Sequence, residues 1–132
     1  MSFLQLRTKR KDTDLLFFPT VTTQAISNIT SSSGDGNGTL INTGGSAISA
    51  RGFVYSSSNT NPTLADSVEV EGGTATGTFT KTISSLSGST LYYVRAYATN
   101  AIGTGYGDMI SFTTTGAAVT AVGGFLTLGI GM

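Results

Sequence analysis

The sequence predicts an all-β protein, a seven-stranded antiparallel sandwich with extensions at both ends. The strongest indication is residues 92–99, where the side chains alternate strictly: Tyr92, Val94, Ala96 and Ala98 against Tyr93, Arg95, Tyr97 and Thr99. Period-two alternation places one set on a packed face and the other on a wetter face, as in a half-buried strand. The second indication is composition, since only 11% of the residues are charged and Gly, Ser and Thr separate short β-branched and aromatic runs. Seven such runs with turn signals between them predict a sandwich.

The expected strands follow one another with short turns between them. We expect them at residues 21–30, 39–42, 48–56, 67–70, 76–83, 92–99 and 109–114. Pro19 begins the domain at an edge position, where its missing N–H does no harm. The short strand 67–70 carries Glu69, with Glu71 just beyond it, and charges on an edge oppose sheet-to-sheet aggregation. Asn100 and the glycines at 103, 105 and 107 end the strand at 92–99, because these residue types tolerate the positive φ of tight turns.

Two Gly-rich stretches predict turns rather than binding loops. Residues 31–38 are turn-rich, and within them Asp35-Gly-Asn37-Gly superficially resembles a calcium loop. Ser46 stands where such a loop needs its closing glutamate, and further oxygen ligands are missing, so we predict a plain turn. The glycines at 103, 105 and 107 lack the GxGxxG spacing of nucleotide-binding loops and open no helix, so this stretch is also predicted to be a turn.

The pattern leaves the orientation of strand 48–56 open. Either Phe53 and Tyr55 fill the core, or they form an outer aromatic patch together with Arg51. We favour the core, because large aromatic side chains stabilise a protein most when they are buried.

A family resemblance starts from the stretch around Tyr92. Leu86, Thr90 and Tyr92, followed by residues 94–100 (VRAYATN), resemble the E–F corner and F strand of a fibronectin type III domain. The resemblance extends to residues 19–23, 50–55 and 110–114, so that it covers residues 19–115. Together these stretches are similar to the tandem fibronectin-like repeats of bacterial surface proteins and phage structural proteins. The resemblance implies a fibronectin type III-like sandwich in which the Tyr92 hydroxyl bonds back to the upstream backbone. Gly88 replaces the usual corner proline, and the tryptophan common in the B strand of eukaryotic members is absent. The fold implies no activity, since this sandwich hosts many functions.

Both extensions contain runs of large apolar residues. Residues 1–18 form an arm with a basic cluster, Arg7, Lys9, Arg10 and Lys11, followed by Leu15, Leu16, Phe17 and Phe18. Residues 116–132 form an uncharged, Gly-rich tail that we expect to form a strand, with Phe125, Leu126, Leu128 and Ile130 as its large apolar residues. Such groups are costly to leave in water, so we expect both segments to be assembly contacts. The basic cluster could make an electrostatic contact, but one short cluster without interleaved aromatics does not predict nucleic-acid binding. The tail is too short and too rich in glycine for a membrane span.

The residue types argue against an enzyme. The chain has no His and no Cys, so the usual nucleophile–base pairs and zinc sites are missing. The carboxylates Asp66, Glu69, Glu71 and Asp108 do not suggest a glycosidase pair. We expect no catalytic residue, no metal and no cofactor.

Three functions remain open. We favour a structural subunit of a larger repeating assembly, a phage virion protein such as a capsid decoration or tail component, whose partners are other copies or other structural proteins. The start of the chain shows no export signal, which favours a virion over secretion. The first alternative is a cell-surface adhesion or carbohydrate-binding module, with Tyr93, Tyr97 and Tyr106 as a surface on which a glycan could stack. The second is an extracellular fibre or pilus subunit that exchanges strands with its neighbours.

Overall fold

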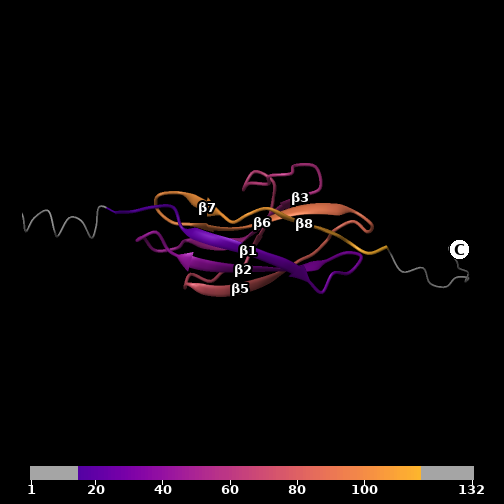
Figure 1. The fold of residues 1–132 in the computed structure, drawn as a ribbon, viewed down its shortest axis with the longest axis horizontal. Coiled ribbons are helices and arrows are strands. Elements are labelled where there is room, and N and C mark those ends of the chain that lie inside the picture. The colour runs from indigo at the N-terminus through magenta and orange to yellow at the C-terminus, as the bar shows by residue number, and fades with distance from the viewer. Residues whose placement is uncertain (1–14, 117–132) are drawn as a thin grey trace, which may run out of the picture.

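The computed structural model describes residues 15–116, which fold into two antiparallel sheets packed face to face (Figure 1). The three-stranded sheet has the order β1-β2-β5, and the five-stranded sheet has the order β4-β3-β6-β7, with β8 also paired to β6. The strands are β1 Thr20–Ser27, β2 Gly34–Asn42, β3 Ala50–Ser56, β4 Ser67–Val70, β5 Gly77–Ile83, β6 Leu91–Thr99, β7 Thr104–Tyr106 and β8 Ile110–Thr113. The predicted antiparallel sandwich is therefore confirmed. No helix within residues 15–116 has the length and hydropathy needed to cross a membrane.

The structure has one strand more than the seven expected, because β7 precedes β8, which corresponds to the expected strand 109–114. β7 and β8 both pair with β6, from Tyr97↔Tyr106 to Thr99↔Thr104 and from Leu91↔Thr113 to Val94↔Ile110. The register shifts by one residue between the two parts, so residues 107–109 form a bulge in one edge strand. The prediction of a turn across residues 103–107 is wrong for Thr104–Tyr106, which form β7.

The prediction of a turn at residues 31–38 is also wrong from Gly34 onward, because β2 begins there. Gly34, Gly36 and Gly38 alternate along the inner face of β2, where aromatic rings from other strands take the place of their missing side chains. A Cβ on Gly36 would lie 2.9 Å from ring atoms of Phe53, and a Cβ on Gly38 would lie 3.0 Å from the Phe79 ring. The glycines therefore allow the two sheets to approach closely.

The core confirms the favoured orientation of β3. Phe53 is fully buried, and its ring centroid lies 5.3 Å from that of Phe79 on the opposite sheet. Tyr55 is half-buried and packs against the same core. Arg51 is buried as well: its guanidinium lies 4.7 Å above the Phe79 ring, and its Nε forms a 2.6 Å ion pair with Glu71. This pair links β3 to the segment that connects β4 with β5.

Along β6, Tyr92, Val94, Ala96 and Ala98 lie in the core as predicted, but Tyr97, which was expected on the wetter face, is buried too. The Tyr92 hydroxyl accepts a hydrogen bond from the backbone N–H of Ser87 at 2.9 Å, which is the corner that the resemblance implied.

Candidate interaction surface at one end of the sandwich

The segment Leu15–Phe18 precedes β1 and lies at the end of the sandwich where β2 and β6 finish (Figure 1). Its backbone is held on both sides. The N–H of Phe17 donates to the carbonyl of Gly44 at 2.9 Å, and the carbonyl of Phe17 accepts from Nδ2 of Asn100 at 2.8 Å. The segment is therefore attached to the two loops that follow β2 and β6.

Asn100 joins the N-terminal segment to the loops that follow β2 and β6. Its side chain is buried, and Nδ2 also donates to the carbonyl of Thr43 at 2.8 Å. Oδ1 accepts from the N–H groups of Ile102 at 2.8 Å and Gly103 at 3.1 Å. The sequence predicted Asn100 as a strand end with positive φ, but the residue ends β6 through these side-chain bonds instead, since Asn100 is not among the non-Gly residues with positive φ. No local pattern distinguishes such an asparagine from an ordinary turn residue.

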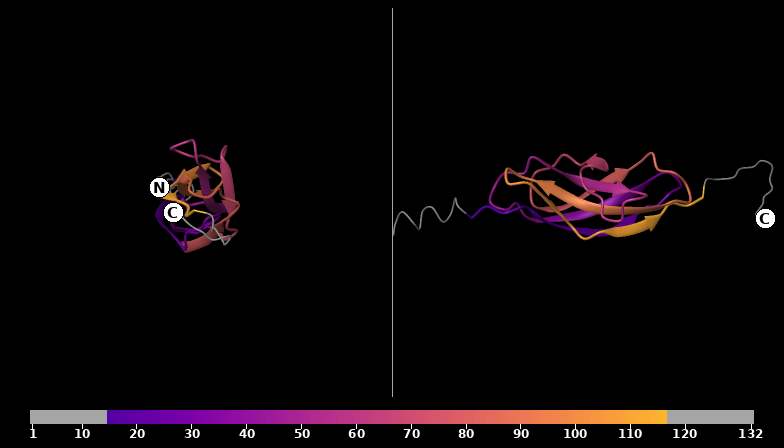
Figure 2. Two further views of the ribbon diagram at one scale, coloured as in Figure 1. Left: turned by 90° about the vertical axis from the view of Figure 1, so that its right-hand side faces the viewer. Right: turned by 90° about the horizontal axis from the view of Figure 1, so that it is seen from above.

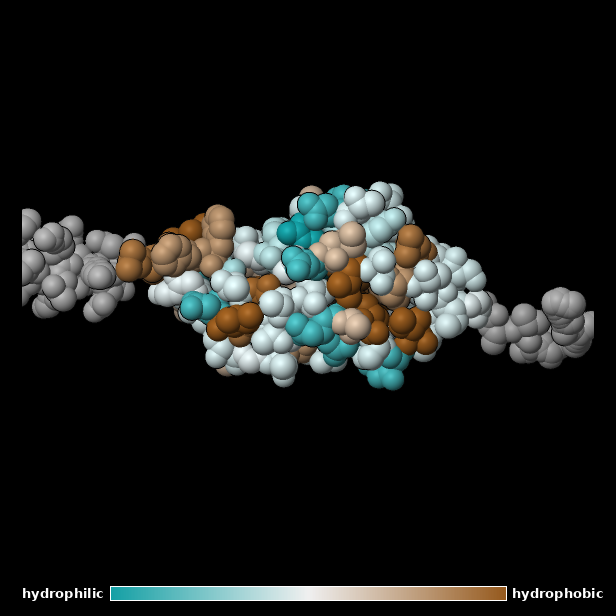
Figure 3. Space-filling view, in the orientation of Figure 1, coloured by the Kyte–Doolittle hydropathy of each residue, from teal (hydrophilic) through white to brown (hydrophobic). Residues whose placement is uncertain are grey.

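The side chains of this segment point largely into solvent although the backbone is fixed. The exposed fractions are 51% for Leu15, 36% for Leu16, 61% for Phe17 and 55% for Phe18, and Ile102 in the adjacent turn is 44% exposed. We call these five residues the apolar pole. Figure 3 shows apolar side chains gathered at the end of the molecule where the N-terminal segment enters.

Two glycines make room for the apolar pole. A Cβ on Gly103 would lie 2.7 Å from Cε1 of Phe18, and a Cβ on Gly45 would lie 3.0 Å from Cδ2 of Leu16. Gly44 has a φ of +81°, which L residues with a side chain rarely adopt, and a Cβ there would contact the Phe17 carbonyl. The two loops are thus shaped to receive the segment. Neither loop, at residues 42–45 and 100–103, carries a charged residue.

The three tyrosines proposed as a glycan-stacking surface do not form one. Tyr97 is 2% exposed, so its expected position on the surface is wrong. The Tyr106 ring is covered by the guanidinium of Arg95 at 4.3 Å, and its hydroxyl accepts from the N–H of Leu64 at 3.1 Å. Tyr93 is half-buried. The loop between β3 and β4 contacts this face at Arg95, which donates a 3.2 Å hydrogen bond to the carbonyl of Pro62. Burial raises the pKa of the Tyr97 hydroxyl.

The suspected calcium loop forms part of β2. The Asp35 carboxylate accepts hydrogen bonds from Asn28 and Thr82, and these bonds lower the pKa of Asp35. Within residues 15–116, no three His, Cys, Asp or Glu side chains come together in a way that could hold a metal ion. The remaining predicted contact residues, Arg7, Lys9, Arg10, Lys11, Phe125, Leu126, Leu128 and Ile130, lie outside the described residues.

The fold and corner define the class: the chain contains a fibronectin type III-like domain, a sandwich of the immunoglobulin-like kind. No family model matches the sequence, and no curated protein matches it either.

Solved structures that are similar to the chain share its fold. The sensor domain of the anti-sigma factor RsgI4 from Pseudobacteroides cellulosolvens superposes with a TM-score of 0.54 at 20% identity, covering 75% of this chain and 96% of that domain. The third fibronectin type III domain of the human KIAA0343 protein gives 0.51 at 12% identity, with 80% and 90% covered. The sixth such domain of human fibronectin type III domain containing protein 3 gives 0.50 at 16% identity, with 76% and 88% covered. Identities this low show the fold alone.

Proposed function

We propose that this protein is a non-enzymatic structural subunit of a larger repeating assembly, held through the segments that flank its sandwich. The observation that carries the proposal is the apolar pole, whose backbone is fixed while its side chains stay 36–61% exposed. A fixed, exposed apolar cluster is the usual mark of a protein–protein contact. The segment is ordered in advance, so a partner would not have to supply the cost of ordering it.

The geometry of the ends supports a linear arrangement. The described part of the chain, residues 15–116, begins and finishes at opposite ends of the long axis of the domain (Figures 1 and 2). The apolar pole is therefore at one end, and the tail with Phe125, Leu126, Leu128 and Ile130 continues the chain from the other. This placement suits copies joined end to end, with the tail of one copy adding a strand to the next.

The strength of the pole indicates that it does not act alone. Full burial of a large apolar side chain stabilises by about 1.5–3 kcal/mol, so completing the burial of five half-exposed ones gives about 4–7 kcal/mol. Association costs about 4–15 kcal/mol in lost motion. The pole by itself yields at most weak association, and a second contact such as the tail is needed. The setting we propose is a virion, as a capsid decoration or tail component, because of the resemblance to phage structural proteins. A cell-surface or extracellular fibre is the alternative.

The test is a pair of variants of the full chain that each remove exposed apolar side chains. Phe17→Ser with Phe18→Ser removes the centre of the pole, and Val70→Ser is the matched control, since Val70 is 53% exposed on the edge strand β4. Sedimentation velocity and electron microscopy should show that the Phe17 and Phe18 variant assembles much less than the native chain while the control assembles normally. Equal assembly of all three proteins would show that the pole is not a contact.

A further inference from the structure

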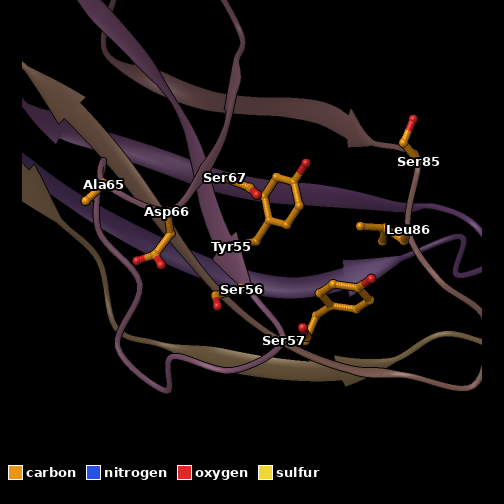
Figure 4. Close-up of a pocket in the computed structure, with 9 residues that line it drawn as sticks. Tyr55, Ser56, Ser57, Ala65, Asp66, Ser67, Ser85 and Leu86 are labelled. Atoms are coloured by element: carbon orange, nitrogen blue, oxygen red, sulfur yellow. The ribbon is translucent and has the colours of Figure 1, made fainter.

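The second feature is a pocket at the end of the domain opposite to the apolar pole. It has a volume of about 540 Å³, within the range of ligand sites. It lies where β3 ends and β6 begins (Figure 4). Its lining comes from three separate stretches of chain and from the start of the strand β6: Tyr55, Ser56, Ser57, Ala65, Asp66, Ser67, Ser85, Leu86 and Tyr92.

The aromatic part of the lining is held firmly. Tyr55 is the direct cross-strand partner of Ser67, and its ring meets that of Tyr92 edge to face at a centroid distance of 6.4 Å. Tyr92 is in turn stacked on Phe112 in the core at 5.9 Å. Figure 4 shows Tyr55 in the middle of the lining, with Asp66 and Leu86 toward opposite sides. The rings thus give the pocket a fixed shape.

The carboxylate of Asp66 is held in place by hydrogen bonds to one of its two oxygens. Its Oδ2 accepts hydrogen bonds from Nδ2 of Asn59 and from the N–H of Thr63, both at 2.9 Å. Within residues 15–116, Oδ1 accepts none, and the hydroxyls of Ser57 and Ser85 take part in none. The pocket therefore offers one fixed charged acceptor and two hydroxyls that can donate or accept.

Two further details belong to this pocket. Ser85 has a φ of +62°, a strained conformation for a residue with a side chain, and such strain tends to occur at functional sites. Burial raises the pKa of the Tyr55 hydroxyl, and the carboxylate of Glu69 adds to the effect. The hydroxyl of Tyr55 therefore stays protonated, and remains a donor, throughout the physiological pH range.

The lining narrows the class of ligand. No Lys, Arg or His lines the pocket, which disfavours an anion, and a single carboxylate is too little for a metal ion. Only Ala65 and Leu86 are aliphatic, so an apolar ligand would leave hydroxyls unpaired. A neutral ligand rich in hydroxyl groups satisfies every group present.

We propose that this pocket binds a neutral sugar unit of a glycan, with Asp66 Oδ1 accepting from its hydroxyls and Ser57, Ser85 and Tyr55 bonding to others. The position differs from the tyrosine face that the sequence suggested. It also lies far from the apolar pole, so a copy held in an assembly by the pole could still present this pocket. Sugar binding at this pocket does not require the proposed assembly.

The test is a titration of the full chain with cellobiose, maltose and N,N′-diacetylchitobiose, followed by the backbone amide signals in two-dimensional NMR. At least one sugar should produce saturable shifts confined to the pocket-lining residues below about 50 mM. Asp66→Asn should weaken that affinity at least fivefold and Tyr55→Phe at least threefold. Asp108→Asn, which removes one exposed charge outside the pocket, should leave it unchanged.

Three outcomes would overturn the proposal. The first is that no sugar gives saturable shifts in the native chain. The second is that shifts map elsewhere, or that Asp66→Asn and Asp108→Asn bind equally while both retain the native spectrum. The third concerns a cationic ligand. The pocket is an ammonium site if three results are found together: n-butylamine shifts the signals of the pocket residues, added salt abolishes these shifts, and the sugars cause no shifts. None of these results bears on assembly, which is measured separately.

Discussion

Replacing Asn100 tests how the N-terminal segment is held. Its side chain makes four hydrogen bonds, two as donor to the carbonyls of Phe17 and Thr43 and two as acceptor in the turn after β6. Each such bond contributes about 0.5–1.5 kcal/mol net, so Asn100→Ala should lower the free energy of unfolding by about 2–6 kcal/mol. At a slope of about 2 kcal/mol per molar urea, the middle of the usual range, the urea midpoint should fall by roughly 1–3 M.

Asn100→Asp separates the two pairs of bonds. It keeps the acceptor but sets a carboxylate against two carbonyl oxygens, so at neutral pH we expect it to be at least as destabilising as Ala. Folding raises the pKa of this carboxyl, so the stability relative to the native chain should recover as the pH falls and the carboxyl becomes a donor. Chymotrypsin cleavage after Phe17 should accelerate in both variants, because the segment is then released.

The control is Asn61→Ala, since Asn61 is exposed and its side chain has no hydrogen bond within residues 15–116. It should change stability by less than about 0.5 kcal/mol. If Asn100→Ala unfolds at the native urea midpoint and is cleaved at the native rate, Asn100 does not hold the segment, and the backbone of the apolar pole is not fixed in the way described.

Three further predictions concern the sandwich itself. Tyr92→Phe leaves the N–H of Ser87 without its acceptor and should cost about 1–3 kcal/mol in urea denaturation; an unchanged midpoint would count against the corner bond. Gly36→Ala places a methyl group 2.9 Å from the Phe53 ring and should cost about 1–3 kcal/mol, whereas a neutral effect would show that the sheets are not closely packed there. The hydrogen bond from Arg51 lowers the pKa of Glu71 in the folded protein. This carboxylate therefore stabilises the fold at pH values above its unfolded pKa, and that contribution to the free energy of unfolding is lost as the pH falls through the folded pKa. Glu71→Gln should therefore be less stable than the native chain at neutral pH and lose less stability on acidification; parallel pH profiles would contradict this.

The strands that carry their own pattern were predictable from the sequence. In β6 the core residues recur at every second position, and this periodicity follows from the pleat of a single strand without help from its neighbours. β2 was not predictable in the same way. Its inner positions are Gly34, Gly36 and Gly38, which have no side chain to give a hydrophobic signal, and the volume they leave is filled by rings from distant strands.

The candidate sites depended still more on tertiary structure. The sequence indicated that Leu15–Phe18 is apolar, but only the fold shows that Asn100, 83 positions from Phe17 along the chain, holds its backbone while the side chains remain exposed. Likewise, the sequence placed Tyr97 on the outer, wetter face of its strand, whereas the folded structure buries it between the neighbouring strands β3 and β7, where it pairs with Gly52 and Tyr106.

The sequence by itself determined the all-β class and the apolar character of residues 15–18 and of the tail, because these depend on periodicity and residue type within short stretches. The corner at Tyr92 came from the resemblance to fibronectin type III domains. The tertiary structure decided which surfaces are open. Tyr55, Asp66 and Ser85 line one pocket although they come from three stretches of chain, and no local pattern links them. Such a pocket exists only where loops from different strands meet, since its shape comes from packing between residues that are distant in sequence.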